Sequence, residues 1–138
     1  MNAKSGRTLF AAGLISAALI GGAISQQDDK LGKVTFATSC DPAVQVEFDR
    51  GVAMLHSYWF LIARRKFEEI LKQDPTCAMA YWGVAMDRLG NTLAITPTRA
   101  EAQAGWEAIE KAQATGAKTQ RERDWIDALG VYFRDHDK

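Results

Sequence analysis

Apolar residues recur every three or four positions through most of this chain, with charged residues between them, which is the spacing of amphipathic α-helices. Boundary signals divide the pattern into five segments, at about 42–57, 60–72, 77–89, 99–114 and 120–133. On the second segment the apolar face consists of Ile62, Ala63, Phe67, Ile70 and Leu71. The pattern predicts an all-α domain.

Local capping residues mark where these helices begin. Asp41 followed by Pro42 is a strong start signal, because the carboxylate accepts from free amides and proline at the first position loses no hydrogen bond. Thr98 with Glu101 and Thr119 with Glu122 each form the capping-box pattern for the last two helices.

A 34-residue frame that begins at Val44 relates successive helices. Gly51, Ala63, Phe67 and Pro75 fall at its positions 8, 20, 24 and 32. These residue types at these positions are typical of a tetratricopeptide unit, a helix-turn-helix repeat. The next frame, from Ala78, carries Tyr81 at position 4 and Ala85 at position 8, as the repeat requires.

The last helix repeats the motif a third time without its second helix. Trp125, Ala128, Leu129 and Tyr132 match a unit that begins at Glu122. The predicted fold is therefore a tetratricopeptide-like antiparallel helix-hairpin array over 41–138, with about five helices and two and a half repeats. An apolar face left open at the end predicts a truncated repeat protein or one that caps itself by association.

The first 25 residues have the pattern of a secretory signal peptide. Lys4 and Arg7 precede an apolar run, and small residues before Gln26 form a cleavage site near Ser25. The alternative is an uncleaved membrane anchor, for which the run is slightly short. We expect a periplasmic or secreted protein whose residues 26–40 form an extended N-terminal arm.

The only two cysteines are Cys40, just before the first helix, and Cys77, just after the second. An oxidising compartment favours their pairing. Antiparallel packing places the start of one helix beside the end of the other, so we predict a disulfide, with two buried free thiols as the alternative. Such a bridge would stabilise the fold by roughly 3 to 4 kcal/mol.

Charge gives no reason to expect a polyanionic partner. The chain has 17 basic and 17 acidic side chains, and loss of Lys4 and Arg7 with the signal peptide leaves 15 basic residues against 17. Neither nucleic acid nor, after signal cleavage, a membrane surface is expected as a partner.

The repeat frame assigns an apolar inner face to the array. The candidates for a peptide-binding groove are Phe48, Val52, His56, Met79, Trp82 and Met86. A methionine-rich apolar groove suits an amphipathic helix or an extended hydrophobic peptide. The alternative is that later repeats or the arm cover Phe48, Trp82 and Met86.

Recognisable catalytic and metal-binding motifs are missing from the sequence. His56 is followed by one further histidine, His136, and neither belongs to a zinc, haem or nucleophile motif. A soft copper site of His56 with Met54, Met79 or Met86 is the metal alternative. We therefore expect no catalytic residue, no metal and no cofactor.

Three segments, VTFATSC, FDRGVAMLHSY and DPTCAMAYWGVAM, resemble the N-terminal region of exported bacterial tetratricopeptide repeat proteins. The resemblance covers about 30–90 well and weakens towards Tyr132. It implies a right-handed array of helix pairs that binds a protein or peptide in its concave groove, in relatives several times longer. The predicted function is a non-catalytic exported scaffold for protein binding. The alternative is the non-catalytic N-terminal part of a larger periplasmic enzyme or metal-binding protein.

Overall fold

The protein is described by a computed structural model over residues 31–90 and 97–134. Its elements are the short 3₁₀ helix η2 (Pro42–Val44) and the helices α1 (Gln45–His56), α2 (Phe60–Gln73), α3 (Ala78–Leu89), α4 (Arg99–Thr115) and α5 (Gln120–Phe133). These residues contain no strand. The all-α prediction is confirmed, and the predicted signal peptide, 1–25, lies outside the described residues.

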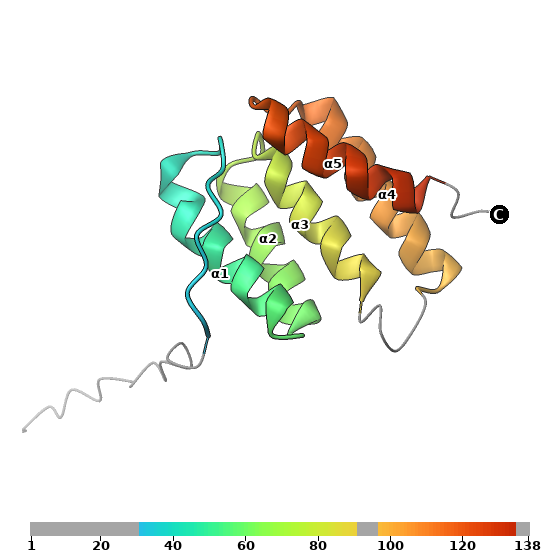
Figure 1. Ribbon diagram of the computed structural model, residues 1–138, viewed down its shortest axis with the longest axis horizontal. Helices are drawn as coiled ribbons and strands as arrows, with labels where there is room; N and C mark the ends of the chain where they lie inside the picture. The colour runs from blue at the N-terminus through green and yellow to red at the C-terminus, as the bar shows by residue number, and fades with distance from the viewer. Residues whose placement is uncertain (1–30, 91–96, 135–138) are drawn as a thin grey trace, which may run out of the picture.

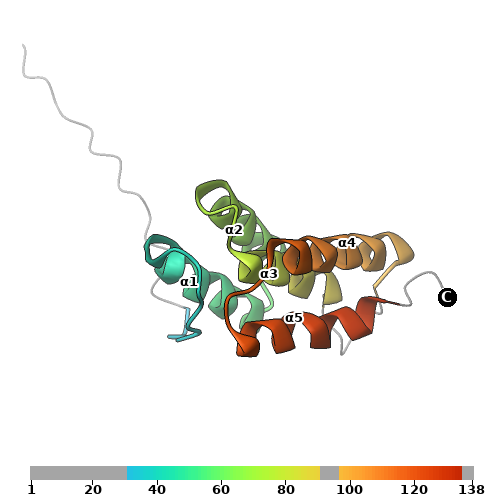
Figure 2. The ribbon, with the colours of Figure 1, turned by 90° about the horizontal axis from the view of Figure 1, so that it is seen from above.

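Each helix packs against the next, so that the chain forms an array of antiparallel hairpins (Figure 1). α3 also contacts both α1 and α5, whereas α2 and α4 lie on the other side of the array (Figure 2). α1, α3 and α5 therefore share one side. This is the helix-hairpin array that the sequence predicts.

The first helix begins differently from the prediction. Asp41 caps the chain as expected, since its carboxylate accepts from the amide of Ala43 at 2.8 Å. The next turn is a 3₁₀ turn, in which the amide of Val44 donates to the carbonyl of Asp41 at 3.0 Å. The α-helix starts only at Gln45. Thr98 and Thr119 form the two predicted capping boxes.

Phe67 of α2 is the centre at which three helices meet. Its ring is fully buried. A Cβ atom built on Gly51 of α1 would lie 2.8 Å from that ring, and one on Gly83 of α3 would lie 2.5 Å from it. Both distances are too short for any other residue without movement, so the two glycines let α1 and α3 close on Phe67 from either side.

Ile62 is an exception to the predicted apolar face of α2, because half of its side chain is exposed. The face that packs consists of Ala63, Phe67 and Ile70, all at 0% exposure. Ile62 lies one residue before Ala63 and so points about 100° away from that line on the helix.

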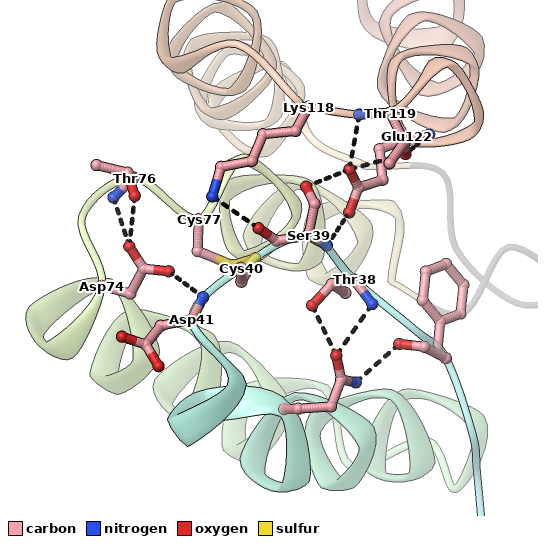
Figure 3. The surroundings of a disulfide bond; sticks show 12 residues. Thr38, Ser39, Cys40, Asp41, Asp74, Thr76, Cys77, Lys118, Thr119 and Glu122 are labelled. Atoms are coloured by element: carbon pink, nitrogen blue, oxygen red, sulfur yellow. Dashed lines mark hydrogen bonds between the residues drawn. A yellow bond between two sulfur atoms is a disulfide. The ribbon is translucent and has the colours of Figure 1, made fainter.

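The predicted disulfide joins Cys40 and Cys77 across 37 positions of the chain. It ties the segment before η2 to the start of α3 (Figure 3). Beside it, Asp74 accepts hydrogen bonds from the amide of Asp41 at 2.8 Å and from the hydroxyl of Thr76 at 2.6 Å. Burial opposes the charged form of Asp74, but these hydrogen bonds prevail and lower its pKa.

Among the described residues, none of the helices has the length and apolar character needed to cross a membrane.

Candidate functional site

The N-terminal arm, defined here as residues 31–40, has no helix or strand and passes in front of α1 (Figure 1). Phe36 anchors it there. Its ring lies 5.7 Å from that of Phe48, 5.4 Å from that of Trp82 and 5.7 Å from that of Trp125. The guanidinium of Arg121 lies 4.7 Å from the centre of the same ring, within the range of a cation–π contact. The arm therefore covers residues that the repeat frame assigned to the open groove.

Side chains of α1 hold the backbone of the arm. The amide of Phe36 donates to Oδ1 of Asp49 at 3.0 Å. Gln45 contacts two peptide groups, since its Nε2 donates to the carbonyl of Phe36 at 2.9 Å and its Oε1 accepts from the amide of Thr38 at 3.0 Å. The same Oε1 accepts from the hydroxyl of Thr38 at 2.8 Å.

The segment before α5 and α5 itself hold the other end of the arm (Figure 3). Glu122 accepts from the amide of Ser39 at 2.6 Å and from its hydroxyl at 2.5 Å. Lys118 donates to the carbonyl of Ser39 at 2.9 Å, and Arg121 donates to the carbonyl of Ala37 at 2.8 Å. The arm is thus bound on both sides through its main chain.

Glu122 connects the arm to the cap of α5 and is only 1% exposed. It also accepts from the amide of Thr119 at 3.3 Å, as the capping box requires, and from the hydroxyl of Thr119 at 2.9 Å. Burial by itself would raise the pKa of this carboxyl group. The hydrogen bonds from Ser39 and Thr119 outweigh that effect and lower the pKa below its usual value of 4.5.

We expect Glu122→Gln to lower the free energy of unfolding at pH 7 by about 1 to 3 kcal/mol, because a neutral amide accepts fewer of these hydrogen bonds and leaves buried donors unpaired. A depressed folded-state pKa gives stability that is complete above the unfolded pKa and is lost as the pH falls through the folded one. The difference between wild type and variant should therefore shrink when urea unfolding is repeated at pH values below 4.5. An unchanged difference down to pH 3 would contradict this assignment.

A pocket of about 240 Å³ lies beside Phe36. Its walls come from the arm, α1, α2, α3 and α5 and are almost entirely apolar and aromatic: Phe36, Val52, Leu55, His56, Phe60, Trp82, Met86, Leu89, Gly90 and Trp125. We call it the aromatic pocket. Among the described residues that line it there is no carboxylate, lysine or arginine.

The structure divides the six groove candidates into two sets. Val52, His56, Trp82 and Met86 line the aromatic pocket. Phe48 and Met79 are 0% and 1% exposed and belong to the core, so they offer no surface to a partner. Within the first set His56 is exposed, Met86 is half-buried, and Val52 and Trp82 present only a small part of their side chains.

Sequence reasoning missed three aromatic residues of the pocket, namely Phe36, Phe60 and Trp125. Phe36 lies in the arm, where its alternation with Val34 among polar residues was the only signal. Trp125 occupies the position in the third unit that Tyr81 occupies in the second, but it is 44% exposed, and its ring meets that of Trp82 edge-on at 5.7 Å.

Trp82 carries one polar side-chain atom, its indole nitrogen. Its Nε1 is buried and has no hydrogen-bond acceptor among the described residues. Buried donors nearly always have a partner.

Only one group of three His, Cys, Asp or Glu side chains in the described segments is close enough to share a metal ion: Cys40, Asp74 and Cys77. Its two sulfur atoms are bonded to each other, so they are not free to act as thiolate ligands. Of the residues in the copper hypothesis, His56 and Met86 line the aromatic pocket, whereas Met54 and Met79 are buried.

One further buried carboxylate, Asp87, lies outside the aromatic pocket. Burial raises its pKa, although Arg64 lies 3.2 Å away. The pair links α2 to α3, and we assign it a structural role.

No protein-family model, curated protein or solved structure matches this chain. The fold and the site therefore carry the functional argument.

Proposed function

We propose that this protein is a non-catalytic scaffold that binds a partner protein through the aromatic pocket. The partner presents a large apolar side chain, such as leucine, methionine or phenylalanine, on an extended or helical segment. The tetratricopeptide character inferred from the sequence is part of this proposal, as is export from the cytoplasm. The Cys40–Cys77 disulfide supports export, because such bonds persist in oxidising compartments.

The aromatic pocket is the observation that carries the proposal. A concave apolar surface with few polar groups is the usual form of a ligand site, and exposed aromatic residues and methionine are enriched where proteins bind one another. Trp125 lines the pocket and is 44% exposed.

Capture of a partner from the periplasm tests the proposal when paired variants are compared. Trp125 and Tyr132 are aromatic residues of α5 with similar exposure, 44% and 50%, but only Trp125 lines the pocket. We expect Trp125→Ala to weaken partner binding about tenfold or more, as for an aromatic anchor, and Tyr132→Ala to leave it unchanged.

A second variant changes the pocket with little risk to the fold. His56 is exposed and lines the pocket, so His56→Asp places a charge beside apolar walls without touching the core. The same loss of partner binding is expected. Equal capture by wild type, His56→Asp and Trp125→Ala would overturn the proposal.

A further inference from the structure

The arm is held in the way that a receptor holds an extended peptide. In the described part of the chain no main-chain to main-chain hydrogen bond joins residues 31–39 to the helices. Instead, side chains of Gln45, Asp49, Lys118, Arg121 and Glu122 contact the main-chain groups of residues 36 to 39. Such contacts depend little on the side chains of the bound segment, and pockets for selected side chains supply specificity.

The helices contact two kinds of side chain in the arm, an aromatic ring and hydroxyl groups. The ring of Phe36 fills a slot between Trp82 and Trp125 under the guanidinium of Arg121. Two and three positions later, the hydroxyls of Thr38 and Ser39 donate to Gln45 and Glu122. Ala37, between Phe36 and Thr38, is exposed, and its carbonyl oxygen accepts a hydrogen bond from Arg121.

We propose that this surface of α1 and α5, here called the arm site, is a second peptide-binding site, and that the arm occupies it as a resident ligand. Its external ligand is an extended segment of another protein with an aromatic residue followed by any residue and two hydroxyl residues. The inference goes beyond the proposed function. The two sites share Phe36, Trp82 and Trp125, but the polar side chains that hold the main chain of the arm do not line the aromatic pocket.

The disulfide determines how exchange takes place. Cys40 is fixed to Cys77, so the arm cannot leave from that end. The anchor farthest from the bridge among the hydrogen-bonded residues is Phe36. An external segment therefore binds as the arm detaches, beginning at residue 31. The contacts of Phe36 determine how strongly the arm competes with that segment for the arm site.

A fluorescent peptide of residues 34–39, Val-Thr-Phe-Ala-Thr-Ser, tests the proposal by fluorescence polarisation against the oxidised full chain. In wild type the arm competes from within the same molecule, so binding is weak. Phe36→Ala removes the main anchor of the arm and should tighten peptide binding about tenfold or more. A control peptide with alanine in place of phenylalanine should not bind either protein.

Two receptor-side variants show whether the peptide occupies the arm site. Gln45→Ala and Arg121→Gln, each added to Phe36→Ala, should weaken peptide binding about tenfold. Arg121 is exposed, so that variant keeps the fold even if Gln45→Ala does not. Hydrogen exchange gives an independent measure, because excess peptide should accelerate exchange of the Phe36 and Thr38 amides in wild type.

The outcomes separate this inference from the proposed function. Peptide binding to Phe36→Ala that both receptor-side variants weaken supports the arm site, whatever the effect of His56→Asp on partner capture. Absence of peptide binding to Phe36→Ala, or binding that Arg121→Gln leaves unchanged, overturns the inference. Trp125 contacts Phe36 and so belongs to both sites. His56 lines the pocket and, within the described residues, has no polar contact with the arm, so the effect of His56→Asp on partner capture tests the proposed function by itself.

Discussion

Replacing both Cys40 and Cys77 by alanine is expected to lower the free energy of unfolding by about 3 to 4 kcal/mol. The bond closes a loop of 37 positions that contains all of α1 and α2, so its loss returns a large conformational freedom to the unfolded chain. The bridge also holds Asp41 next to Asp74, and Ser39 next to Glu122 of α5. Guanidinium unfolding followed by circular dichroism measures the change.

Wild type treated with a phosphine reductant is the matched control, because it removes the bond without changing the sequence. It should unfold at nearly the same denaturant concentration as the double variant. A difference of under about 1 kcal/mol between oxidised wild type and the double variant would show that the bridge contributes little, contrary to the chain-entropy argument.

Phe67→Ala is expected to lower the free energy of unfolding by about 3 to 5 kcal/mol. The ring is fully buried and lies against the backbone of α1 at Gly51 and of α3 at Gly83. Backbone at this distance cannot move in to fill the space, so the cavity stays open. Thermal and denaturant unfolding measure the loss, which should exceed that of Tyr132→Ala, a half-exposed aromatic of α5.

A double-mutant cycle tests whether the glycines explain this sensitivity. Gly83→Ala places a Cβ atom 2.5 Å from the ring and should destabilise the protein by about 1 to 3 kcal/mol through overpacking. In the background of Phe67→Leu the same substitution should cost clearly less, because the two residues share one space. If the effects of Gly83→Ala and Phe67→Leu were strictly additive, contact with the Phe67 ring would not be the reason why Gly83→Ala destabilises the protein.

Local sequence signals account for most of the helix bounds. α5 was predicted over the residues that form it, and the predicted caps Asp41, Thr98 and Thr119 all accept hydrogen bonds from the following turn. Capping depends on residues three positions apart, so it can be read from the chain. The prediction was wrong at η2, where the first turn is 3₁₀ and not α. The two kinds of turn begin with the same residues and differ in whether an amide donates to the carbonyl three or four positions earlier.

The candidate site was predicted less completely, and Phe48 shows why. The repeat frame assigns Phe48 to the inner face of the array, but it contains no information on residues before the repeat. Phe36 covers that face from outside the frame and turns Phe48 into core. Val52, His56, Trp82 and Met86 remain at the pocket because the arm stops covering the surface beyond the Phe36 ring.

Helical periodicity, caps and the spacing of small residues fixed the secondary structure, the hairpin order and the closeness of Cys40 to Cys77, because each depends on near neighbours or on one repeat frame. Contacts between residues more than 80 positions apart decided the site. Ser39 meets Glu122, and Phe36 meets Trp125, only when five packed helices bring the two ends of the array together. No spacing along the chain encodes such a contact, because it follows from the summed packing of all the helices between them.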